Sequence, residues 1–140
     1  MGNFVKRIVI VVSGTLVLIL AMLSLSASAA ELQQVKPEEL KKMIESNKTD
    51  FLVVDAQPLG AYDAGHVKGA INFPWAPEIG NPTRKLPKDK LLIIYCDCGH
   101  EEDATDTATQ LMEKWKYTNI KLLEGGWSKW QELGYPIDKK

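Results

Sequence analysis

Two cysteines one residue apart are the side chains with the clearest chemistry in this chain. Cys96 and Cys98 are the two cysteines of the 140 residues, and they follow the apolar run 91–95 directly. A segment of helical period begins at Asp103, so backbone N–H groups of the loop and the positive end of the helix dipole would favour a thiolate. The same N–H groups could hold a persulfide anion. We therefore predict that Cys96, at the end of the apolar run, is a nucleophile.

The loop around these cysteines is acidic. Asp97, Glu101, Glu102 and Asp103 bring four formal negative charges close to the thiols. At 4 Å and an effective dielectric of about 20, one like charge costs a thiolate on the order of 4 kcal/mol. Acids in a first helical turn also interact favourably with the helix dipole, so Glu102 and Asp103 could serve the helix alone.

Two histidines and one further aspartate complete the set of candidates. His100 is close to the thiols and could move a proton, or it could be a solvated loop residue. Asp55 closes the apolar run 51–54, where its carboxylate could accept N–H bonds that orient the loop or could cap the next turn. His66 is interpreted as a turn residue.

The elements that must position these residues alternate along the chain. Strand-like runs cover 32–35, 51–54, 70–73, 91–95 and 120–123. Helical spacing covers 37–47 and 58–64, begins again at Asp103, and returns after Gly125-Gly126 with Trp127 and Trp130 on the core side. The stretch 74–90 holds four prolines and is predicted to be a surface loop. This alternation predicts an α/β fold, a parallel sheet with helices on both faces, in which ligands bind at the carboxyl ends of the strands.

Composition narrows the classes of function. Apolar residues make up 45% of the chain and charged residues 25%, as in an ordinary globular protein. The formal charge of −1 lacks the basic excess that nucleic-acid binding needs, so no nucleic-acid partner is expected. Two cysteines cannot build a disulfide framework or a four-thiolate metal site, and no cofactor is expected.

The first thirty residues have the pattern of a secretory signal. Lys6 and Arg7 precede an apolar run, 8–23, and Ala27-Ser28-Ala29 forms a small-residue cleavage site. We expect a signal peptide over 1–30, one domain over 31–140, and a periplasmic or secreted protein. An uncleaved signal would be the one route to a membrane, although a helix of sixteen residues, interrupted by Ser13, Gly14 and Thr15, is short of the roughly 20 apolar residues that a bilayer takes.

Three stretches together resemble the single-domain rhodaneses, sulfurtransferases that carry sulfur as a cysteine persulfide. They are Asp55 at its strand end, the segment 62–74, and the segment 123–127 with Trp130. The resemblance covers residues 31–140 and implies a five-stranded parallel sheet flanked by helices on both faces. It places Cys96 at the sulfur-accepting position, with a small sulfur-containing donor and a thiol or other acceptor as partners. Further site residues expected on this basis are Cys98 and His100 in catalysis and Asp55, Asp97, Gly99, Glu101 and Glu102 in substrate binding, with no metal ligand.

The loop departs from the common rhodanese pattern. Gly99 is kept, but Glu101 and Gln57 stand where the family usually has arginines. The loop resembles a subgroup with Cys-x-Cys and a His/Asn-Glu pair, which usually has Pro at the position of Gly99. Without a guanidinium fork, doubly charged thiosulfate is expected to be a poor donor.

Three other functions remain open. Cys98 could resolve Cys96 into a disulfide in a thiol redox protein. Cys96, Cys98 and His100 could bind a soft metal ion, although a fourth ligand is not obvious. The domain could also be a non-catalytic binding module. A phosphatase is disfavoured because Glu102 occupies the place of the phosphate-binding arginine.

Overall fold

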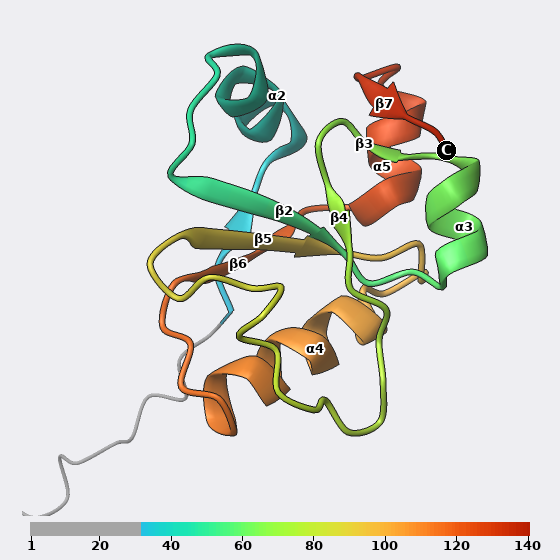
Figure 1. The fold of residues 1–140 in the computed structure, drawn as a ribbon. Coiled ribbons are helices and arrows are strands. Elements are labelled where there is room, and N and C mark those ends of the chain that lie inside the picture. The colour runs from blue at the N-terminus through green and yellow to red at the C-terminus, as the bar shows by residue number, and fades with distance from the viewer. Residues whose placement is uncertain (1–31) are drawn as a thin grey trace, which may run out of the picture. The chain divides into compact units, whose positions relative to one another are not determined.

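The computed structural model of the protein describes residues 32–140 (Figure 1). The predicted signal peptide, 1–30, lies outside these residues. The elements are β1 (Gln34–Val35), α2 (Pro37–Glu45), β2 (Phe51–Asp55), α3 (Leu59–Ala64), β3 (His66–Val67), β4 (Ile71–Asn72), β5 (Leu91–Tyr95), α4 (Glu102–Glu113), β6 (Ile120–Leu123), α5 (Gly126–Glu132) and β7 (Ile137–Asp138). Within residues 32–140 no helix is long and apolar enough to span a bilayer.

Five strands form one parallel sheet in the order β1-β6-β5-β2-β4, which confirms the predicted sheet. Strand β5 lies at its centre, and residues 92–95 are fully buried. Strand β5 is apolar on both faces because helices cover both faces of a central parallel strand. Figure 1 shows α4 on one face of the sheet and α2 and α5 on the other.

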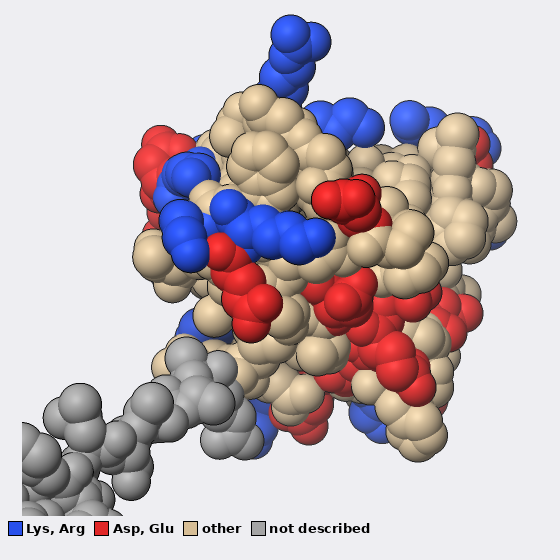
Figure 2. Space-filling model, turned by 90° about the horizontal axis from the view of Figure 1, so that it is seen from below, with Lys and Arg blue, Asp and Glu red and all other residues tan. Residues whose placement is uncertain are grey.

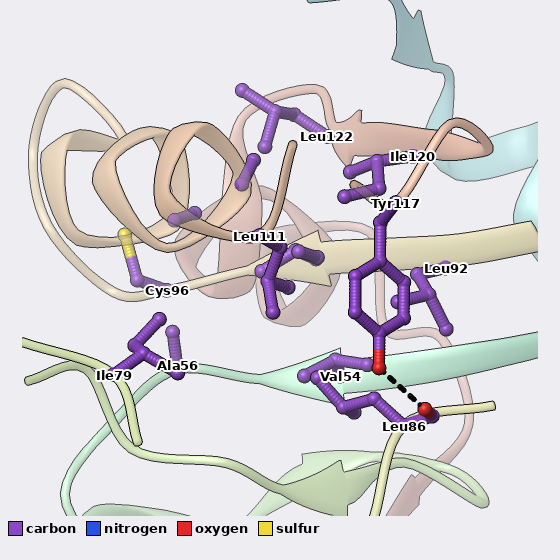
Figure 3. Close-up of a cluster of buried hydrophobic side chains, with 13 residues drawn as sticks. Val54, Ala56, Ile79, Leu86, Leu92, Cys96, Leu111, Tyr117, Ile120 and Leu122 are labelled. Carbon is purple, nitrogen blue, oxygen red and sulfur yellow. Dashed lines mark hydrogen bonds between the residues drawn. The ribbon is translucent and has the colours of Figure 1, made fainter. Parts of the chain in front are cut away.

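Each face of the sheet carries its own apolar cluster. On the α4 face, alternate residues of β2 and β5 pack against Ala108 and Leu111 (Figure 3). On the other face, Leu40 of α2 and Trp130 of α5, both fully buried, cover the remaining side chains of the same strands. The period-two alternation of β5 thus divides its residues between two cores.

The stretch 74–90 differs from the surface loop that its prolines predict. Ile79 and Leu86 are buried in the α4-face cluster. The Tyr117 hydroxyl donates to the Leu86 carbonyl at 2.7 Å (Figure 3), and Gln110 accepts from the Ile79 N–H at 2.9 Å. Because these tethers come from α4 and the turn after it, the loop closes the cluster beside the helix instead of standing in solvent.

A second, two-stranded sheet has no counterpart in the sequence prediction. Strands β3 and β7 pair antiparallel, with His66 opposite Asp138 and Val67 opposite Ile137. Each strand has two residues, which is too short to show a period of two in the sequence. The pair fastens the C-terminal segment to the edge of the domain near α3 (Figure 1).

Candidate active site

The cysteine pair lies where the central strands end. Because β2 and β5 pair in register, Asp55 lies opposite Tyr95, and the next residue of each chain segment enters the loops at the carboxyl edge of the sheet. A pocket of about 260 Å³ opens there. It is lined by Gln57, Pro58, Ala61, Cys96, Asp97, Cys98 and Asp103. Two larger pockets, of about 430 and 380 Å³, border α2 and contain neither cysteine nor histidine, so the smaller pocket is the candidate site.

Cys96 and Cys98 are joined by a disulfide bond. Cys96 is 2% exposed and belongs to the α4-face cluster, whereas Cys98 is partly exposed at the pocket. The backbone N–H of Asp103, in the first turn of α4, donates to Sγ of Cys98 at 3.4 Å. The end of the helix dipole therefore acts on Cys98 directly, a placement that loop spacing alone did not predict.

The backbone of Cys96 is held by the start of α5. The N–H of Trp127 donates to the Cys96 carbonyl oxygen at 2.9 Å. A side chain at Gly126 would place its Cβ 2.5 Å from that oxygen, and Gly126 has a φ of +54°. Only glycine meets both conditions without strain, so the Gly-Gly-Trp turn is needed to fix the cysteine loop.

Two of the four acids near the cysteines, Glu101 and Glu102, do not line the pocket. Glu101 accepts from the Gly125 N–H at 2.6 Å and from the Gln34 amide at 3.0 Å. Glu102 accepts from the His100 N–H at 3.3 Å, at the start of α4. These carboxylates bind backbone and side-chain donors of neighbouring segments, which is a structural use of their charge.

Asp97 and Asp103 are the two acids that line the pocket. Asp97 also accepts from the Ser128 hydroxyl at 2.6 Å. Over residues 32–140, neither takes part in a salt bridge, so no cation offsets their charge at the pocket. Figure 2 shows acidic side chains gathered on the half of this face where α4 begins. The pocket therefore favours neutral over anionic ligands.

A buried hydrogen-bond network lies behind the pocket. Tyr95 donates to Oδ2 of Asp55 at 2.6 Å and accepts from the Val67 N–H at 3.0 Å. Asp55 also accepts from the Gln57 N–H at 2.8 Å and from the Gln57 side-chain amide at 3.2 Å. Burial raises the pKa of Asp55, and these hydrogen bonds lower the pKa without cancelling the effect of burial. Burial and the neighbouring carboxylate also raise the pKa of Tyr95, so Tyr95 stays protonated as a donor.

The remaining predicted residues lie further from the sulfur atoms. Gly99 and His100 are exposed in the turn before α4, and neither lines the pocket. His66 is buried in β3, stacked on Tyr62 with ring centroids 3.7 Å apart. Within residues 32–140, no three His, Cys, Asp or Glu side chains gather as a metal site requires.

Sequence reasoning missed three residues that hold the site: Gln34, Tyr95 and Ser128. Their contacts join residues that are 67, 40 and 31 positions apart. No local pattern marks such pairs, although Tyr95 could have been noticed as a polar atom at the end of a strand buried on both faces.

A comparison with protein families finds a match that covers most of the described chain. The rhodanese-like domain model matches residues 36–133. A sulfur carrier protein, TtuD, of Thermus thermophilus is 33% identical over 96 residues, or 57% of this chain and 33% of that protein. An HTH-type transcriptional regulator, Rv0324, of Mycobacterium tuberculosis is 31% identical over 90 residues, or 64% of this chain and 38% of the regulator.

Solved structures share the fold. The BH2092 protein of Bacillus halodurans superimposes with a TM-score of 0.69 at 24% identity, over 76% of this chain and 77% of that one. The present chain spans between about a third and two fifths of the length of the curated relatives it matches.

Proposed function

The chain belongs to the rhodanese-like domain family, and on that premise we propose that it is a sulfurtransferase in which Cys96 carries sulfane sulfur as a persulfide. The observation that carries this proposal is the position of Cys96, directly after the central strand β5, at a pocket beside the start of α4. Among its relatives, TtuD is named as a sulfur carrier protein.

The proposed reaction starts from the reduced cysteine pair. The Cys96 thiolate attacks the outer sulfur of a persulfide donor, R–S–SH, which gives Cys96–S–SH and releases RS⁻. An acceptor thiolate then attacks the outer sulfur of the Cys96 persulfide, takes up that sulfur, and leaves the Cys96 thiolate. Atoms and charge balance in both steps, and Cys96 returns to its initial state.

The lining of the pocket supports a donor of low charge. Gln57 offers a neutral amide where rhodaneses usually have an arginine two residues after the strand-ending Asp, and it already donates to Asp55. Asp97 and Asp103 oppose the approach of a dianion. We therefore propose that thiosulfate is a poor donor and that alkyl persulfides are better ones.

The same proposal includes export from the cytoplasm. Its support is the pattern of Lys6, Arg7, the apolar run 8–23 and Ala27-Ser28-Ala29. N-terminal sequencing of the protein recovered from a periplasmic extract tests it, and a chain that still begins at Met1 in the membrane fraction would contradict it.

Intact-mass analysis tests the sulfur chemistry. The reduced protein is treated with glutathione persulfide, desalted and weighed, and the same is done with Cys96→Ser and Cys98→Ser. We expect the wild type and Cys98→Ser to gain one sulfur atom and Cys96→Ser to gain none. Equal loss of loading in both variants would show that the two cysteines act as one unit and that Cys96 is not the carrier by itself.

A second candidate function is dithiol–disulfide exchange, which the Cys96–Cys98 bond favours. In that function the pair passes two electrons to or from a partner disulfide, and no sulfur atom stays on the protein. The mass experiment separates the two functions, because an exchange protein changes by two hydrogen atoms and retains no added sulfur.

A further inference from the structure

We propose that the oxidised protein takes its sulfur from hydrogen sulfide, with the Cys96–Cys98 disulfide as the oxidant. Hydrosulfide attacks Sγ of Cys96 and breaks the bond to Cys98. The products are a persulfide, Cys96–S–SH, and a thiolate on Cys98. This inference rests on the proposed function for the later transfer of the sulfur, and it names the donor for the oxidised state of the same site.

The contacts of the two sulfur atoms favour Cys98 as the leaving group. When a disulfide is attacked, the sulfur that leaves takes the negative charge. Sγ of Cys98 accepts the backbone N–H of Asp103 at the start of α4, a helix of 12 residues, so charge on Cys98 is stabilised as it forms. For the residues that the structure describes, no N–H donor to Sγ of Cys96 is found within hydrogen-bond distance, so attack at Cys96 is favoured over attack at Cys98.

The burial of Cys96 and the charge of the pocket favour a small nucleophile that can enter in a neutral form. Cys96 is 2% exposed and lies at a pocket of about 260 Å³, so a nucleophile with one heavy atom reaches its sulfur more readily than a bulky one. At neutral pH part of the sulfide is neutral hydrogen sulfide, which passes Asp97 and Asp103 without the repulsion that an anion meets. At the disulfide it gives one proton to water and becomes the attacking hydrosulfide. Bulky thiols meet the more exposed Cys98 first, and their attack would leave no sulfur on Cys96.

The electrons balance within this single step. The sulfur of hydrosulfide is oxidised by two electrons to the sulfane level, and the disulfide is reduced by the same two electrons. The proton of hydrosulfide stays on the terminal sulfur of the persulfide. Each oxidised chain can therefore load one sulfur atom, with no further oxidant.

Sulfide titration of the oxidised full-length protein tests the proposal. Protein without free thiols is mixed with sodium sulfide under nitrogen, alkylated, weighed, and fragmented between Cys96 and Cys98. We expect one added sulfur atom per chain on Cys96 and an alkylated thiol on Cys98. Sulfur found on Cys98, a disulfide reduced with no sulfur retained, or a disulfide that reacts with dithiothreitol but not with sulfide would each overturn it.

Two controls keep this result separate from the proposed function. Cys98→Ser cannot form the disulfide, so it should take no sulfur from sulfide. Wild-type protein that loads from glutathione persulfide when reduced, but not from sulfide when oxidised, would refute the inference alone. Reduced protein that fails with glutathione persulfide would refute the proposed function instead.

The role of the Asp103 N–H has its own pair of variants. Asp103→Pro removes the donor to Cys98 without breaking an intrahelical hydrogen bond, because N–H groups of the first turn have no partner within the helix, and Asp103→Ala removes the same carboxylate but keeps the N–H. We expect Asp103→Pro to react with sulfide roughly three- to tenfold more slowly than Asp103→Ala, the loss of one ordinary hydrogen bond. Equal rates in the two folded variants would overturn this choice of leaving group; if Asp103→Pro does not fold, the position of the sulfur in the wild type decides.

Discussion

The carboxylate of Glu101 accepts a hydrogen bond from the backbone N–H of Gly125 at 2.6 Å, which joins the cysteine loop to the turn before α5. Its other oxygen accepts from the side chain of Gln34, on β1. Glu101 itself adopts a left-handed backbone conformation, with φ of 59°, at the N-cap of α4. An acid at this position thus ties three segments together at the carboxyl edge of the sheet.

Removing this carboxylate should loosen the cysteine loop. We expect Glu101→Ala to lower the free energy of unfolding by about 1 to 2 kcal/mol, since it leaves the Gly125 N–H and the Gln34 amide without their acceptor. Glu101→Gln, which keeps an acceptor oxygen, is the matched control. Urea unfolding measures the loss of stability, and hydrogen exchange at the Gly125 amide measures the loosening of the loop. An unchanged exchange rate in Glu101→Ala would show that the contact does not hold the loop.

Gly126 sets how closely α5 approaches the cysteine loop. Gly126→Ala should destabilise the protein by roughly 2 kcal/mol or more, because the new Cβ would lie 2.5 Å from the Cys96 carbonyl oxygen at a positive φ. It should also slow persulfide loading, since Cys96 must shift. Gly60→Ala is the control, because a Cβ there meets nothing within 4 Å. Thermal unfolding and loading kinetics of both variants check the prediction, and equal stability of the two variants would contradict it.

Tyr95 should make stability depend on pH through Asp55. Tyr95→Phe removes the donor to Asp55 and the acceptor of the Val67 N–H, so we expect a loss of roughly 2 to 3 kcal/mol at neutral pH. The pKa of Asp55 is already raised by burial, and it should rise further without the hydrogen bond from Tyr95. A carboxyl whose folded pKa lies above its unfolded pKa favours folding at low pH, and this contribution is lost as pH rises through the folded pKa.

The destabilisation by Tyr95→Phe should therefore be larger at about pH 7 than at about pH 3.5, where Asp55 is largely protonated in both states. Urea unfolding at the two pH values measures the difference. Tyr62→Phe is the control, since its hydroxyl donates to the Ala70 carbonyl and to no carboxylate. A loss that is the same at both pH values would mean that the Tyr95 hydroxyl does not stabilise the charged form of Asp55.

Charge at the pocket should select the donor. We expect Asp103→Asn and Asp97→Asn each to speed loading from thiosulfate by about three- to tenfold, and loading from glutathione persulfide by less, because each variant removes one negative charge beside the sulfur atoms. Glu113→Gln, at the far end of α4, changes the net charge equally and should have little effect. Stopped-flow loading of the reduced proteins with both donors provides the measurement. Efficient loading of the wild type from thiosulfate, with no gain in either variant, would contradict the prediction.

Sequence alone determined the architecture wherever buried residues form a long run of apolar side chains or a long periodic pattern. The run 91–95 is apolar at every position, and only a strand covered on both faces accommodates that, so the centre of the sheet could be predicted. The alternation of such runs with segments of helical spacing predicted a parallel sheet with helices on both faces, as observed. In such a sheet Cys96, which follows a strand directly, lies at the carboxyl edge. This position was sufficient to make Cys96 the candidate nucleophile, without knowledge of its contacts.

Tertiary structure alone decided which neighbours the cysteines have. Four acids stand near Cys96 in sequence, yet Glu101 and Glu102 bind N–H donors outside the pocket, while Asp97 and Asp103 line it. The side chain of Glu101 is directed by partners 24 and 67 positions away, and a contact of that range leaves no local periodicity. The same reason explains why the sequence did not predict the burial of Ile79 and Leu86 or the pairing of β3 with β7. Both depend on contacts between segments that are distant along the chain, and such contacts leave no local pattern in the sequence.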